Sequence, residues 1–156
     1  MKNARAYTLV EAVISVAILS VVLLGVYGVL LTGNAVFTKD INLLDMEQQT
    51  RNALDRIVRE ARPASSQTIL TNYNNTTNDK ITIFSPTTPT GVQYYLSGTD
   101  LVRSYSGTAQ NVASNISLLK FTLTGSLLQI QASADKTIYA HTISFALTEK
   151  VRLRNE

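Results

Sequence analysis

The longest apolar segment of the chain covers residues 12–31, and no charged residue occurs from position 12 to position 38. About 20 apolar residues let an α-helix cross the ~30 Å hydrocarbon core of a bilayer. The segment therefore predicts a membrane-spanning helix. One carboxylate, Glu11, stands at its start. An acid in such a segment is costly to bury, so its presence indicates a function.

The charges on either side of this helix predict its direction in the membrane. Lys2 and Arg5 precede it, whereas Lys39 and Asp40 follow it and cancel each other. The positive-inside rule then places the N-terminus in the cytoplasm. We expect a single-pass protein of the inner (cytoplasmic) membrane with an extracytoplasmic C-terminal domain. A cleaved secretory signal is the weaker alternative, because its apolar core would be only about 7 to 15 residues long.

An amphipathic helical pattern follows the apolar segment. Its apolar stripe comprises Leu43, Met46, Thr50, Leu54, Ile57 and Ala61, widened by Leu44 and Val58. These steps of three and four residues predict a helix with one buried face. Charges of alternating sign stand four residues apart at Glu47, Arg51, Asp55 and Arg59, and again at Arg56 and Glu60. They predict a solvated opposite face. Pro63 ends the pattern, so one helix from about Tyr7 to Arg62 is expected.

Beyond Pro63 the pattern becomes that of short β-strands. Residues 64–80 are rich in Ser, Thr and Asn and predict a surface loop. Strands are predicted at 80–84, 92–96, 101–105, 117–123, 127–131 and from 137 onward. Hairpin turns at 97–100 and 124–126 favour antiparallel pairing. In the last strand, one parity is mostly apolar and the other carries Lys150, Arg152 and Arg154. That strand should have a buried and a wet face.

These elements together predict an α+β fold. A long N-terminal α-helix, first a membrane anchor and then an amphipathic spine, packs on a C-terminal antiparallel β-sheet. We see no internal repeat and no second domain in the sequence.

The first residues carry a resemblance to a known family. The leader MKNARA, followed by YTLVE at the head of the apolar helix, resembles the class III signal of type IV pilins and type II secretion pseudopilins. This resemblance implies that a prepilin peptidase cleaves between Ala6 and Tyr7 and that the new Tyr7 amine is N-methylated. Thr8, Leu9 and Glu11 match the part of the motif that serves assembly. The implied division is a leader at 1–6, a transmembrane and assembly helix at 7–38, a helical spine at 39–62 and a β-rich head at 63–156.

The resemblance also implies a role for Glu11. An ionised carboxylate in an apolar filament core needs a cation, and in this family the glutamate is thought to pair with the N-terminal amine of a neighbouring subunit, here Tyr7. The alternative is a carboxylate at the headgroup boundary, where it reaches water or favours the N-terminal end of the helix dipole. The chain departs from the family in having Ala6 where Gly is more common. It also has Gly25 and Gly28 where many major pilins have Pro, and these glycines allow either local melting or close helix packing.

Two further segments, RNALDRIVREARPAS and ALTEKVRLRN, resemble minor pilins and minor pseudopilins. The expected function is therefore that of a structural filament subunit, with a minor (initiating or tip) role. The implied partners are other pilins or pseudopilins bound through the N-terminal helix, the prepilin peptidase and an inner-membrane assembly platform. After assembly the chain would lie in a pilus or pseudopilus.

Composition argues against catalysis. The chain has no Cys and one His, so it lacks a thiol nucleophile and the usual multi-histidine zinc site. His141 lies on the apolar parity of the last predicted strand, which favours a structural role. No nucleophile elbow or phosphate-binding glycine loop occurs. We expect no enzyme activity, cofactor or metal.

Charge leaves a second hypothesis open. The formal charge of +3 falls to +1 when Lys2 and Arg5 leave with the leader. A small basic strip remains at Lys150, Arg152 and Arg154, and Tyr94, Tyr95 and Tyr105 are candidates for stacking on bases. The alternative function is a binding module, displayed on a filament or anchored in the membrane, for DNA, surfaces or secreted substrate, with nucleic acid as the minor option. A third hypothesis is an ordinary anchored domain that forms no filament.

Overall fold

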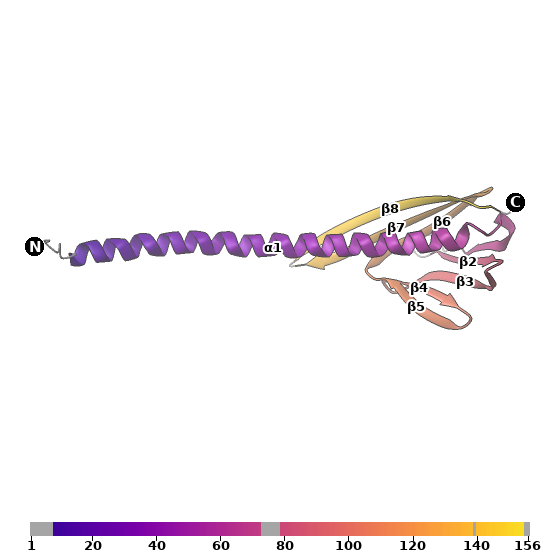
Figure 1. Cartoon of the computed structure of the whole chain (residues 1–156), viewed down its shortest axis with the longest axis horizontal. Helices are drawn as coiled ribbons and strands as arrows, with labels where there is room; N and C mark the ends of the chain where they lie inside the picture. Colours follow the sequence, from indigo (N-terminus) through magenta and orange to yellow (C-terminus); the bar gives the residue numbers. More distant parts are fainter. Residues whose placement is uncertain (1–7, 73–78, 139, 155–156) are drawn as a thin grey trace, which may run out of the picture. The chain divides into compact units, whose positions relative to one another are not determined.

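The computed structural model describes residues 8–72, 79–138 and 140–154. The chain divides into two compact units, one up to Asp40 and one from Ile41 onward. A single helix, α1 (Leu9–Ala61), contributes residues to both. The N-terminal unit consists of the first part of α1, whereas the second unit, the head, contains the rest of α1 and all eight strands (Figure 1).

The N-terminal part of α1 is long and apolar enough to cross a membrane, and none of its most apolar window is buried. Its serine and threonine hydroxyl groups are nonetheless satisfied inside the helix. The Ser15, Ser20 and Thr32 hydroxyls each donate to the backbone carbonyl four residues earlier, at 2.7 to 3.0 Å. Because these side chains need no outside partner, the helix surface is suited to an apolar environment.

The part of α1 in the head buries one face, as the periodicity predicts. Its buried residues are Met46, Thr50, Ala53, Leu54, Ile57 and Ala61, with Leu43 and Val58 partly buried. The prediction for Leu44 is wrong, because this side chain is 64% exposed. Ala53, which was not predicted, lies on the buried face instead. The helix ends at Ala61, which confirms the stop before Pro63.

The strands form two antiparallel sheets, where the sequence predicted one. The five-stranded sheet has the order β1 (Ile69–Asn72), β2 (Lys80–Ser85), β3 (Thr88–Ser97), β4 (Asp100–Tyr105) and β5 (Thr108–Ala113). The three-stranded sheet has the order β6 (Ile116–Thr124), β7 (Leu127–Ile138) and β8 (His141–Arg152). The core lies between α1 and these sheets and includes Leu54, Ile57, Tyr94, Phe121 and Ile130. Helix and sheets therefore form one α+β head.

Two predicted boundaries need correction. The loop predicted at 64–80 contains a short 3-10 helix, η1 (Ser66–Thr68), and strand β1, while residues 73–78 lie outside the described residues. The strand predicted from 137 onward is two strands: β7 continues to Ile138, and β8 begins at His141 after Ala140, whose φ is +63°. The two predicted hairpin turns are confirmed, with Gly98 and Gly125 at positive φ between paired strands.

Asp79 links the two sheets at the entrance to β2. Its backbone N–H donates to the Leu119 carbonyl at 3.0 Å, and its carboxylate accepts the Phe121 N–H at 3.0 Å. Both partners lie on β6, so Asp79 occupies the outer edge of that strand.

Candidate assembly site

The start of α1 brings Thr8, Leu9 and Glu11 together. Thr8 caps the helix, because its Oγ1 accepts the Glu11 backbone N–H at 3.3 Å and its carbonyl accepts the Ala12 N–H at 3.2 Å. Glu11 occupies the third helical position, where the helix dipole favours a carboxylate. This placement suits both interpretations of Glu11. Ala6 and Tyr7, the two residues of the predicted cleavage site, lie outside the described residues.

The surroundings of Glu11 are apolar and exposed. Leu9, Val10, Val13 and Ile14 are all exposed around it. Among the residues that the structure describes, no side chain pairs with the Glu11 carboxylate. The site thus combines a carboxylate with an apolar surface that no other part of its own unit covers.

A shallow groove runs along the same helix further on. Its floor is made by small residues, Gly25, Gly28, Thr32 and Gly33, with larger apolar side chains such as Leu24 and Phe37 at its sides. Nothing lies within 4 Å of a Cβ placed on any of the three glycines. The helix is continuous through Gly25 and Gly28, so both alternatives for these glycines, close packing and local melting on assembly, stay predictions.

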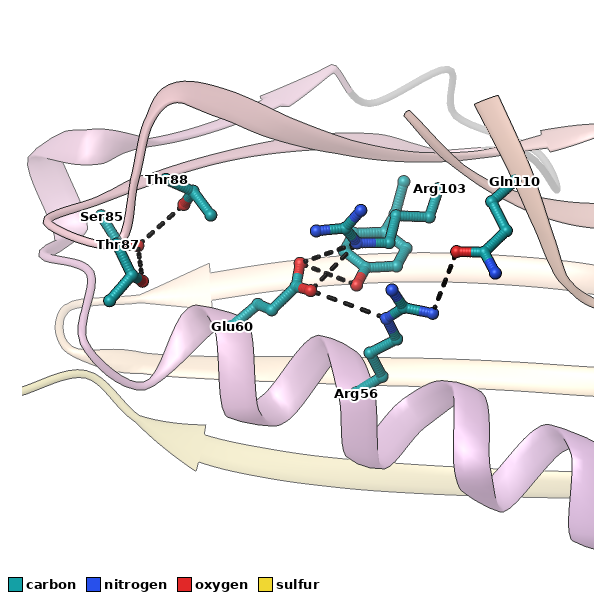
Figure 2. Close-up of polar contacts among 8 residues, drawn as sticks. Arg56, Glu60, Ser85, Thr87, Thr88, Arg103 and Gln110 are labelled. Carbon is teal, nitrogen blue, oxygen red and sulfur yellow. Dashed lines mark hydrogen bonds and ion pairs between the residues drawn. The ribbon is translucent and has the colours of Figure 1, made fainter. Parts of the chain in front are cut away.

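A second carboxylate, Glu60 of α1, lies at the contact with the five-stranded sheet (Figure 2). It accepts a hydrogen bond from the Tyr94 hydroxyl at 2.9 Å and one from Arg103 Nε at 3.0 Å. The pair with Arg56, predicted from its spacing, is confirmed at 3.6 Å. The bonds to Tyr94 and Arg103 were not predicted, because these partners are 34 and 43 residues away in sequence.

The electrostatics of this cluster explain its ionisation states. Burial raises the pKa of Tyr94, and the negative charge and hydrogen bond of Glu60 raise it further, so Tyr94 stays a neutral donor. Burial lowers the pKa of Arg103, but its hydrogen bond and charge interaction with Glu60 outweigh this effect and the net direction is upward. The cluster therefore fixes α1 to the sheet through charge-assisted bonds.

The residues of the alternative binding hypothesis fall into two groups. Lys150, Arg152 and Arg154 are exposed, as predicted. Tyr94 is buried, while Lys80 lies 5.6 Å from the Tyr95 ring and Arg103 lies 5.5 Å from the Tyr105 ring. These contacts leave the tyrosines poorly placed for stacking on bases. His141 has the parity of buried Ile143 but is itself exposed, so its predicted place on a buried face is wrong.

Comparison with protein families bears on the N-terminal region alone. A model of the prokaryotic N-terminal methylation motif matches residues 1–27. The chain carries a prepilin-type methylation motif. This motif covers Ala6, Tyr7 and Glu11, is consistent with a type IV pilin-like protein and supports a pilin or pseudopilin-type subunit. It implies assembly with other pilin subunits and processing by a prepilin peptidase, and with the apolar helix it fits membrane anchoring. No curated protein and no solved structure matches the chain significantly.

Proposed function

We propose that this chain is a minor, non-catalytic structural subunit of a type IV pilus-like or type II secretion pseudopilus filament. One observation carries the proposal: the methylation motif at residues 1–27 includes the start of a helix, from Leu9, whose apolar side chains are exposed around a single carboxylate, Glu11. The minor role rests on the resemblance of segments in α1 and β8 to minor subunits.

In this proposal the apolar helix has two successive environments. It first holds the chain in the inner membrane as a single pass, with the head outside and the N-terminus accessible to the prepilin peptidase. The assembly platform then moves the subunit into the filament, where the helix packs on the helices of its neighbours. A charged carboxylate there requires a cation, since an unpaired buried charge costs several kcal/mol. The Tyr7 amine of a neighbour supplies that cation.

Replacement of Glu11 tests this proposal. We expect Glu11→Ala and Glu11→Gln to reduce incorporation into filaments at least about tenfold, because both remove the charge that pairs with the amine. Incorporation is measured by immunoblotting of sheared filaments against the membrane fraction. Glu47→Gln is the matched control, because Glu47 is a helical glutamate whose pair with Arg51 is largely exposed. If Glu11→Ala enters filaments as well as the parent, our account of Glu11 is wrong.

A second candidate function, a binding module for an anionic polymer such as DNA, has one supporting observation. Lys120, Lys150 and Arg152 are exposed, and the strand register places them on the outer face of the three-stranded sheet. Binding of duplex DNA to the full chain in detergent, measured at 20 to 200 mM salt, tests it. Phosphate contacts make such binding strongly salt-dependent. Absence of binding at the lowest salt would remove DNA from consideration.

A further inference from the structure

Strand β8 forms an edge of the three-stranded sheet that no other described strand covers, and just beyond its end the Arg154 N–H donates to the Arg62 carbonyl at 3.0 Å. β8 pairs with β7 alone, through a twelve-residue antiparallel register without a shift. The opposite edge, β6, is occupied by the backbone and carboxylate of Asp79. An edge strand presents backbone N–H and C=O groups that can pair with another strand. β8 is therefore the longest regular stretch of such groups in the described part of the head.

The first eight residues of β8 lack the charges and the proline that usually protect an edge, whereas Glu149, Lys150 and Arg152 follow them. From His141 to Thr148 the strand contains no charged residue and no proline, whereas natural edges are commonly protected by charges, bulges or short length. The edge strands of the five-stranded sheet are shorter: β1 has four residues, and β5 has six, with a register shift where it pairs with Leu101 and Val102. The uncharged part of the β8 edge, residues 141–148, is therefore the stretch most open to pairing.

An exposed apolar surface lies along the same edge. Arg51 stands 5.8 Å from the ring of Phe145 on β8, and Leu44 and Glu47 share the flank of α1 that carries Arg51, because they are separated by three and four residues. Leu44 on that flank is 64% exposed. Phe145 and Leu147 are only partly buried. A strand added beside β8 would cover Phe145 and Leu147.

We propose that β8 binds an extended segment of a different membrane-anchored subunit as a fourth strand of this sheet. The inward residues of that segment are apolar and pack on Phe145 and Leu147. Its outward residues include at least one acid, which lies beside Lys150 and Arg152. Both cations are exposed, and neither forms an ion pair with any described residue. Backbone pairing supplies affinity, and the apolar and charged positions supply specificity.

Neither two-fold antiparallel pairing nor parallel pairing in register with a second copy of this chain fits the edge. Antiparallel pairing of two β8 strands about a two-fold axis would make the two α1 helices antiparallel. Two chains anchored in one membrane, as the proposed function requires, have parallel helices. Parallel pairing in register would instead place Lys150 and Arg152 beside the same cations of the other copy, which is unfavourable. This exclusion of a second copy and the membrane anchor of the partner both rest on the proposed function.

Site-specific photocrosslinking in the native host tests the proposal. A benzoylphenylalanine replaces Ala146, which is exposed on the outer face of β8, in the full chain. The control position is Thr122, which is exposed on the covered strand β6. We expect position 146, and not 122, to crosslink to a segment of a different protein that has its own N-terminal membrane helix. Mass spectrometry must map the adduct to residues that alternate between apolar and polar and include an acid.

Charge reversal provides the second arm. The double variant Lys150→Glu and Arg152→Glu should reduce the yield of the 146 adduct at least fivefold, whereas Lys120→Glu, on the far strand of the same face, should leave it unchanged. Circular dichroism confirms that each variant is folded. No adduct at 146, an adduct to a second copy, or equal yields at 146 and 122 would overturn the proposal. Yields are measured in the membrane and filament fractions separately, so absence of the chain from filaments tests the proposed function, while the membrane adduct tests β8.

Discussion

Leucine side chains are exposed in the N-terminal unit of the chain, whereas several are buried in the head. Leu19 in the N-terminal unit is 56% exposed, whereas Leu54 in the head is fully buried. The head buries its apolar residues between its own helix and sheets. The N-terminal unit has an apolar surface that its own residues do not cover, so its stability depends on a lipid bilayer or on other helices.

The same contrast holds for charge. Glu60 in the head receives hydrogen bonds from Tyr94 and Arg103, whereas the Glu11 carboxylate has no partner among the described residues. The head neutralises its partly buried carboxylate internally. In our account, the N-terminal unit obtains the corresponding cation from another subunit. The comparison separates residues that fold the chain from residues that assemble it.

Truncation of a leucine in each unit should give the largest difference in stability. Leu54→Ala removes a fully buried side chain from the core and should lower the free energy of unfolding by about 2 to 5 kcal/mol. Leu19→Ala should change it by less than about 0.5 kcal/mol, because Leu19 is exposed and belongs to no core formed by the described residues. Urea unfolding of the full chain in detergent, followed by circular dichroism of the β-rich head, measures both. Equal losses would contradict the separation of the two units.

Removal of the Glu60 charge should have the next largest effect. Glu60→Gln weakens the bonds from Tyr94 and Arg103 and leaves a partly buried guanidinium unpaired, at a cost of about 1.5 to 3 kcal/mol. Glu47→Gln, in a mostly exposed pair, should cost less than about 0.5 kcal/mol. The same unfolding assay applies. A loss with Glu60→Gln no larger than that of the control would show that the cluster adds nothing to the attachment of α1.

Replacement of a glycine by alanine should destabilise the head but stabilise the helix of the N-terminal unit. Gly91 has φ +80°, and a Cβ there would lie 2.6 Å from Cε1 of Phe84, so Gly91→Ala should destabilise the head by about 1 to 3 kcal/mol. Gly28 lies in α1 with open space around it, and Gly28→Ala should favour the helix by up to about 1 kcal/mol. Thermal unfolding tests the first change, and helix content of the full chain in detergent tests the second. Unchanged stability with Gly91→Ala would contradict the close approach of Phe84.

Alkaline pH should give the smallest effect. The pKa of Tyr94 is raised in the folded head above the ordinary value of 10.0. Because the folded head holds the Tyr94 proton more tightly than the unfolded chain does, Tyr94 contributes fully to the free energy of unfolding below pH 10. This contribution falls as the pH rises above 10, by about 1 kcal/mol near pH 11. Unfolding of the parent and of Tyr94→Phe at several pH values isolates this contribution, because other titrating groups affect both proteins. If the stability of the parent and of Tyr94→Phe falls equally with pH, the raised pKa of Tyr94 is contradicted.

Elements with local periodicity were predictable from the sequence. The stripe from Met46 to Ala61, the stop before Pro63 and the turns at Gly98 and Gly125 all depend on residues close together in the chain. Strands β1 and β5 were missed because ILTN and TAQNVA are too short or too polar to show alternation. The far end of β7 was missed because small residues such as Ala132 and Ala134 fill its buried positions.

In the candidate site, too, contacts between residues close in sequence were predictable and contacts between distant residues were not. The motif residues Thr8 and Glu11 are three positions apart, so their grouping was visible in the sequence. The attachment of Glu60 to Arg103 joins residues 43 positions apart, and no local pattern reports such a contact. The exposure of Leu44 likewise depends on where the sheets end, since its spacing alone favours burial.

Mass spectrometry of the N-terminus tests the central claim most directly. The full-length chain is purified from native cells that contain an active prepilin peptidase, and its N-terminal peptide is identified. Our account predicts a chain that begins at Tyr7, carries a methyl group on its α-amine and lacks the leader at 1–6. A chain that retains Met1 and the leader in such cells would contradict it.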